Sequence, residues 1–202
     1  GYRGPIYTQG ASAELLPIML LDTASLSESE AERANRYRRR GEPKAQPLFS
    51  AEDVHATLRQ VQPLAYDQRT TILPGVDIAL RDAGHILGSA IVELWADGRK
   101  LVFSGDLGPK GTPILRDPAV VQQADLLLME STYGDRNHRD RPETIRELGE
   151  IFEHAWRDRG NVLIPAFAVG RTQELLYWFA RHWNDWDMSR WRIFLDSPMA
   201  SK

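Results

Sequence analysis

The sequence predicts an α/β protein in the broad α+β sense, because helical and strand patterns follow one another along the chain in two different ways. Residues 1–61 carry helical spacing behind one short strand, and residues 76–106 carry short alternating strands separated by glycine-bearing turns. Beyond Gly134, strands and helices alternate as they do in parallel β-α-β units. We therefore place a domain boundary near Gly134, which divides the chain into residues 1–134 and 135–202.

The first part opens on a predicted strand, "GPIYT" at 4–8, and three helices are expected behind it. These helices cover residues 9–21, 27–39 and 51–61. Pro17 lies inside the first and should kink or shorten it, because proline has no N–H to donate. Gly41 is expected to end the second helix. Ser50 precedes the third, and Asp53 three residues later gives a pattern close to a capping box.

The strand-rich middle of the chain contains "VDIALRDA", "SAIVELWA" and "RKLVFSGD", with "ADGRK" as a hairpin turn between the last two. The apolar run "ADLLLME" at 124–130 predicts a strand buried on both faces. In the last third, we expect helices over 142–159 and 169–182 and strands over 161–167 and 191–196.

The bulk composition is that of an ordinary globular protein: 202 residues, 42% hydrophobic and 26% charged, with a net charge of −3. The absence of cysteine excludes disulfides and thiolate ligands, so any metal must be held by His, Asp or Glu. No apolar run approaches the roughly 18 residues of a membrane span, and we expect a cytoplasmic protein without a membrane partner. The chain starts with Gly1 rather than Met, and both ends read as cut, so we expect a piece of a longer protein.

His85 lies between two glycines in "RDAGHILGSA", in a loop that joins two predicted strands. Most histidines in loops are solvated or bonded to nearby backbone. Here Gly84 and Gly88 allow a tight turn and a close approach to a ligand, and Asp82 could orient the imidazole, so the pattern also fits a metal ligand.

Asp106 directly follows the apolar strand "KLVFS" and sits between Gly105 and Leu107. It fits either a turn or a helix cap, which is the commonest use of such an aspartate, or a carboxylate at the catalytic edge of a sheet. In the second case its two oxygens could bridge a pair of divalent metals.

Glu130 ends the apolar run and precedes "STYG", where it could cap the next segment or support a catalytic histidine. In "PAFAVGRTQELL", a helix opens after a strand at Gly170, so Arg171 and Thr172 fit either a routine turn or a phosphate contact. The basic run at 33–44 is either a solvated helix face or a nucleic-acid contact. The sequence contains neither a Gly-x-Ser-x-Gly elbow nor a Walker loop.

Taken together, five stretches resemble the metallo-β-lactamase superfamily, and more closely its beta-CASP branch of nucleic-acid nucleases. They are "DAGHILGSA", "LVFSGDLG", "LLLMESTYGDR", "IPAFAVGRTQELL" and "FLDSPMA", in this order. The resemblance implies a metallo-β-lactamase-like αβ/βα sandwich, present in part within residues 1–134. This sandwich leads into the first part of a β-α-β beta-CASP cap domain within residues 135–202.

The resemblance also implies roles for individual residues. His85 and Asp106 would be metal ligands, Asp106 and Glu130 catalytic residues, and Arg171 and Thr172 substrate-binding residues. It implies a nuclease that cuts single-stranded RNA with two zinc ions. The family's His-x-His-x-Asp-His motif is absent from the sequence, so we expect this chain alone to bind zinc weakly and to cut poorly.

Two other functions stay open at this stage. One is a non-catalytic beta-CASP paralogue that acts as a scaffold in an RNA-processing complex. The other is a different hydrolase of the lactamase fold, acting on a thioester or a lactam. The sequence also leaves open whether the chain forms a homodimer.

Overall fold

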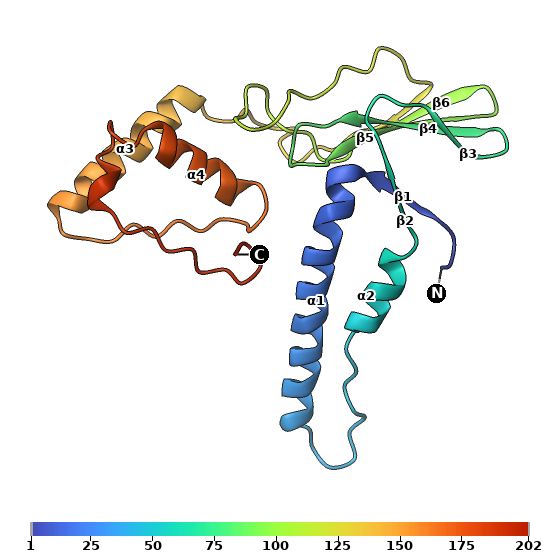
Figure 1. The fold of residues 1–202 in the computed structure, drawn as a ribbon, viewed down its shortest axis with the longest axis horizontal. Coiled ribbons are helices and arrows are strands. Elements are labelled where there is room, and N and C mark those ends of the chain that lie inside the picture. Colours follow the sequence, from blue (N-terminus) through green and yellow to red (C-terminus); the bar gives the residue numbers. More distant parts are fainter. Residues whose placement is uncertain (1, 202) are drawn as a thin grey trace.

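The computed structural model describes residues 2–201, and the terminal residues Gly1 and Lys202 lie outside this range. A short parallel sheet pairs β1 (Ile6–Gln9) with β2 (Val61–Leu64). Between these strands the chain forms a long helical arm that projects from the main sheet (Figure 1). The arm consists of α1 (Gly10–Arg36), a return segment and α2 (Ala51–Leu58).

Helix α1 corrects the prediction of two separate helices over residues 9–21 and 27–39. The helix runs through Pro17 without interruption and ends at Arg36. Residues 22–26, which were expected to separate the two helices, contain neither glycine nor proline, so nothing in them stops a helix. The cap of α2 is confirmed, because Ser50 and Asp53 form a reciprocal capping box.

The main sheet has five strands in the order β3-β4-β5-β6-β7. The strands are β3 (Thr70–Leu73), β4 (Val76–Asp82), β5 (Ala90–Ala96), β6 (Arg99–Phe103) and β7 (Leu126–Leu128). All neighbours are antiparallel except β6 and β7, which are parallel. The predicted hairpin between β5 and β6 is confirmed, and Asp97 and Gly98 both take the positive φ that such a tight turn requires.

Strand β7 departs from the prediction of burial on both faces. It is an edge strand with β6 as its one neighbour, and Leu126, Leu127 and Leu128 are about half exposed. The core of the sheet lies further in, where Ala83 and Ile91 are buried. The apolar run is typical of a strand covered on both faces, but within residues 2–201 its side chains are only about half covered.

The last third of the chain contains α3 (Arg141–Arg157), α4 (Arg171–Arg181) and the short 3-10 helix η1 (Met188–Arg190). They enclose a small core of Phe152, Phe179 and Met188, with Trp191 packed against it. Both helices confirm the predicted ones to within a few residues.

The two strands predicted over residues 161–167 and 191–196 do not form within residues 2–201, where these segments have no regular secondary structure and no strand partner. Val162 and Ile164 pack against the aromatic core, whereas Leu163 and Phe194 are 93% and 83% exposed. The accessible surface of the chain, 14899 Å², exceeds the value of about 9,600 Å² expected for a compact protein of this mass. The projecting arm and the uncovered apolar segments account for this excess.

Candidate functional site

The loop between β4 and β5 carries His85 and is folded tightly by its own hydrogen bonds. The N–H of His85 donates to Oγ of Ser89 at 3.1 Å, and the N–H of Gly84 donates to Oδ1 of Asp82 at 2.9 Å. Asp82 therefore caps the turn, and within the described residues no hydrogen bond joins it to the imidazole that it was expected to orient. The His85 side chain is exposed on a backbone that is fixed from both sides.

Two residues from distant parts of the chain hold this loop from outside. The hydroxyl of Tyr66 donates to the carbonyl of Ser89 at 2.8 Å, and burial raises the pKa of Tyr66 to about 12, so the phenol keeps its proton. The hydroxyl of Ser12, at the start of α1, donates to the carbonyl of Gly88 at 2.8 Å. Sequence reasoning missed both residues, because their partners lie 23 and 76 positions away.

The loop that carries Asp106 is in direct backbone contact with the His85 loop. The N–H of Gly108 donates to the carbonyl of Ala83 at 2.9 Å. A Cβ at Gly108 would lie 1.6 Å from the carbonyl oxygen of Gly84, so only glycine fits there. His85 and Asp106 therefore project from touching loops at one rim of the sheet, and both side chains are exposed. Their roles as metal ligands stay predictions.

The carboxylate of Glu130 anchors the Asp106 loop by hydrogen bonds. Its Oε1 accepts the N–H of Leu107 at 2.6 Å, and its Oε2 accepts the N–H of Thr132 at 3.4 Å. The N–H of Leu107 is the largest cause of a pKa for Glu130 below the ordinary 4.5, and the nearby His85 charge acts in the same direction. Glu130 is therefore an ionised acceptor at neutral pH, which suits a positioning group better than a proton donor.

The start of α4 meets the same rim. Gly170 has a φ of +90°, and a Cβ there would lie 2.8 Å from Cγ2 of Ile86, the neighbour of His85. Thr172 is buried, and its hydroxyl donates to the carbonyl of Phe167 at 2.7 Å. Arg171 is largely exposed and pairs with Glu174 at 3.1 Å. The structure thus brings the candidate phosphate-binding turn next to the His85 loop.

The side chains at this rim do not complete a metal centre. A structural zinc site has four ligands and a catalytic one at least three from the protein. Across residues 2–201, no group of three or more His, Asp or Glu side chains is placed to hold a metal ion. His85 and Asp106 supply at most two donors, so we derive no chemical step through zinc from this chain.

A hollow in the described part of the chain lies away from this rim. It measures about 620 Å³ and is bordered by α3 and residues 182–186, including His154, His182 and Trp186. None of its lining residues comes from the loops of His85, Asp106 or Glu130. The imidazole of His182 is already engaged there, since it bonds Asp185 at 2.9 Å and stacks on Trp186.

Comparison with known proteins yields no matching family model but clear relatives. The chain is 41% identical over all 202 residues to the ribonuclease TTHA0252 of Thermus thermophilus, of which it spans 42%. It is 30% identical over 182 residues to the transcription termination factor FttA of Methanococcus maripaludis and 34% identical over 181 residues to that of a Lokiarchaeum. These alignments cover 87% of the chain and 26% of either factor.

By these similarities the chain is homologous to nucleases of the metallo-β-lactamase superfamily. Within that superfamily its relatives are the beta-CASP nucleases, as the five sequence stretches predicted. The chain spans less than half the length of the curated relatives cited above. In the part of the chain that the structure describes, no helix has the length and apolar character that a membrane crossing requires.

Proposed function

We propose that the chain supplies part of the active site of a zinc-dependent ribonuclease that hydrolyses phosphodiester bonds in single-stranded RNA. The observation that carries the proposal is the backbone contact between the His85 and Asp106 loops, made through Gly108 and Ala83. The identity of 41% to a ribonuclease over the entire chain supports the same reaction. Identity to the termination factors is lower and covers less of the chain.

In this proposal each predicted site residue has a distinct task. His85 and Asp106 are metal donors, and further donors from outside residues 2–201 complete the centre. Glu130 fixes the Asp106 loop by accepting the N–H of Leu107. Arg171 offers its exposed guanidinium to a phosphate of the substrate, and Thr172 anchors the turn that presents it.

We infer the domain organisation from the same resemblance. Residues 1–134 form part of an αβ/βα sandwich of the lactamase type, to which the five-stranded sheet belongs. Residues 135–202 form the first part of a beta-CASP cap, to which α3 and α4 belong. The apolar core under these two helices supports a separate folding unit.

Zinc titration tests the assignment of the metal donors. We expect weak zinc binding by the 202-residue chain in isothermal titration calorimetry, and a further loss of about tenfold or more for His85→Ala and Asp106→Ala. His154→Ala is the matched control, because His154 is another exposed histidine, on α3. Unchanged zinc binding by His85→Ala would contradict the proposal.

The scaffold alternative is distinguished by cleavage of labelled RNA. The nuclease proposal predicts zinc-dependent cutting by the longer polypeptide that carries the remaining donors, and a loss of cutting with Asp106→Ala. A scaffold would bind the same RNA and leave it intact at every zinc concentration. The incomplete donor set within residues 2–201 is the observation that keeps this alternative in view.

A further inference from the structure

The far end of the helical arm carries a dense group of unpaired positive charges. This basic tip is defined as residues 33–44, and its six basic residues are Arg33, Arg36, Arg38, Arg39, Arg40 and Lys44. All six are exposed, and the one acidic residue among them is Glu42. Within residues 2–201 none of the six forms an ion pair with an acid.

In this respect the basic tip differs from α3. Arg139, Arg146 and Arg157 lie on or beside α3, are similarly exposed, and each pairs with a glutamate. Single unpaired arginines occur elsewhere in the described residues, as at Arg59 and Arg181, but the tip gathers six basic residues and one acidic residue within twelve positions. The charge of the basic tip is left for a partner outside the described residues.

The tip is presented on a defined backbone. The amide of Asn35 makes two hydrogen bonds of 2.9 Å to the backbone of Ala45 and so closes the turn. The N–H of Leu48 donates to Oγ of Ser27 at 2.8 Å, and the N–H of Ala51 donates to Glu28, which ties the return segment to α1. A surface fixed in this way loses less entropy on binding than a free tail does.

An aromatic side chain stands among the charges. Tyr37 lies between Arg36 and Arg38 and is 77% exposed, with no aromatic partner in the part of the chain described. Proteins that bind single-stranded nucleic acid combine basic side chains for the phosphates with exposed aromatics on which bases stack. An acidic protein partner would use the charges but would not need the exposed ring.

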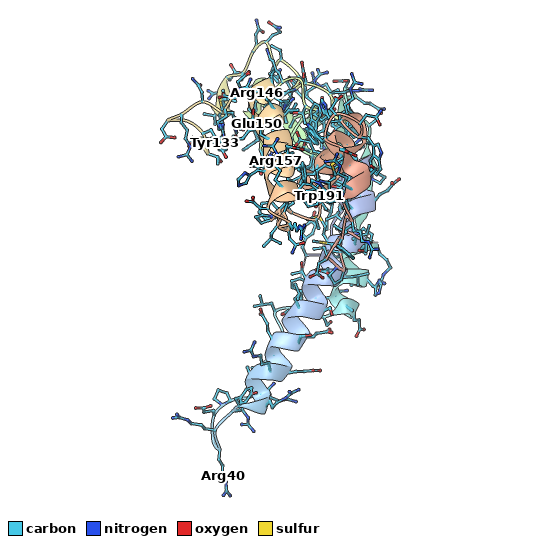
Figure 2. The ribbon with its side chains drawn as sticks, turned by 90° about the vertical axis from the view of Figure 1, so that its left-hand side faces the viewer. Arg40, Tyr133, Arg146, Glu150, Arg157 and Trp191 are labelled. Carbon is cyan, nitrogen blue, oxygen red and sulfur yellow. The ribbon has the colours of Figure 1, made fainter. Side chains whose placement is uncertain are left out.

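The arm also fixes the distance between the basic tip and the candidate active site. Its base touches the His85 loop through the hydrogen bond from Ser12 to Gly88. At 1.5 Å per residue, the helix carries Arg36 about 36 Å away from Ser12. Figure 2 shows Arg40 at the extreme end of the arm, far from the labelled residues around α3. At about 3.4 Å per nucleotide, as in a fully stacked strand, this distance corresponds to roughly ten nucleotides, and a more extended single strand spans it with fewer.

We propose that the basic tip is a second nucleic-acid contact, which binds the phosphate backbone of single-stranded RNA roughly ten nucleotides from the His85 loop. That this RNA is also the substrate rests on the proposed function. The binding itself does not, because it requires neither zinc nor cleavage. The tip thereby favours long substrates over short ones, since a long strand reaches both surfaces at once.

Fluorescence anisotropy with labelled oligouridylate, in the presence of a chelator, tests the proposal. We expect the wild-type chain to bind a 24-nucleotide oligomer at least about tenfold more tightly than a 6-nucleotide oligomer. The triple variant Arg36→Gln, Arg39→Gln, Arg40→Gln should lose this length dependence. Its slope of log affinity against log salt should also fall by about 2, at about 0.7 for each phosphate contact removed.

The matched control removes the same charge from another helix. The triple variant Arg139→Gln, Arg146→Gln, Arg157→Gln should keep the wild-type length dependence. Equal losses in both triple variants would mean a diffuse charge effect and would overturn the proposal. The chelator removes any metal from this assay, so failure here is separable from failure of the zinc proposal, which calorimetry tests.

A single substitution tests the nucleic-acid assignment without altering the charge. Tyr37→Ala should weaken binding of the long oligomer by about fivefold or more through lost base stacking, and Tyr37→Phe should restore it. Competition with polyglutamate provides the other arm of the test. If polyglutamate displaces the oligomer at equal charge concentration and Tyr37→Ala has no effect, the tip is a docking surface for an acidic protein and the nucleic-acid proposal is wrong.

Discussion

Replacing Glu93 by glutamine should lower the free energy of unfolding by more than the loss of any exposed ion pair does. Glu93 is 2% exposed in β5. Its carboxylate accepts a hydrogen bond from Nε of Arg81 at 2.7 Å and also contacts the ammonium of Lys100. The amide in Glu93→Gln removes the negative charge and leaves both cations uncompensated beside a buried position.

The magnitude follows from how far the partners reach solvent. Breaking a buried ion pair costs about 3–5 kcal/mol. Arg81 is 35% and Lys100 20% exposed, and Arg81 retains Asp67 at 2.6 Å. Solvent therefore recovers part of the loss, and we expect a reduction of about 2–3 kcal/mol in the free energy of unfolding.

Urea denaturation followed by circular dichroism at pH 7 measures this value. Glu153→Gln is the control, because Glu153 pairs with Arg157 on the surface of α3, where such a pair contributes about 0.3–0.5 kcal/mol. A cost for Glu93→Gln no larger than that of the control would refute the reasoning, since it would mean that the buried charge has no role in stability.

The pH dependence of Glu93 provides an independent check. Burial is the strongest single influence and raises the pKa of Glu93, but hydrogen bonds from Lys100 and Arg81 together outweigh it and leave the pKa below 4.5. A lowered folded-state pKa means that this stabilisation is complete above pH 4.5 and is lost as the pH falls through the folded value. The difference between wild type and Glu93→Gln should therefore shrink in acid; a constant difference from pH 7 to about pH 3 would contradict the assignment.

Further substitutions have expected outcomes. Gly108→Ala should lower the free energy of unfolding by more than about 2 kcal/mol and abolish zinc binding, because its Cβ would overlap the His85 loop, whereas Gly10→Ala, in open space, should be neutral or stabilising; urea curves and calorimetry measure both. Ser50→Ala should cost about 1 kcal/mol of stability in the same urea assay, because it removes the cap of α2. Leu163→Lys and Phe194→Lys should reduce concentration-dependent self-association in analytical ultracentrifugation, because both native side chains are apolar and exposed.

Local signals in the sequence were sufficient wherever neighbours along the chain decide the structure. The capping box of Ser50 and Asp53 and the tight turn at Asp97 and Gly98 are both set by residues within a few positions of each other. Such features depend on hydrogen bonds that the segment makes with itself. The boundaries of α3 and α4 were predictable for the same reason.

Features that depend on distant partners were missed or misjudged. The pattern of β7 indicates coverage on both faces, which residues 2–201 do not provide. The anchoring of Leu107 by Glu130 joins residues 23 positions apart, and no motif records it. The single helix α1 escaped prediction because residues 22–26, which are compatible with a helix, were taken as a break between two helices. The glycines beside His85 and Asp106 drew attention to two loops that do touch, but the hydrogen bonds that hold these loops could not be predicted.

The contact between Ser12 and Gly88 makes the amino acids tolerated at these two remote positions depend on each other. The hydroxyl of Ser12 donates to the Gly88 carbonyl, and a Cβ on residue 88 would sit 2.4 Å from that hydroxyl oxygen. A bulkier side chain at either position would push the first turn of α1 away from the loop that carries His85. Sequence drift in the two segments is therefore coupled, and tolerance to change should be lowest at this joint and highest midway along the outer surface of the helix.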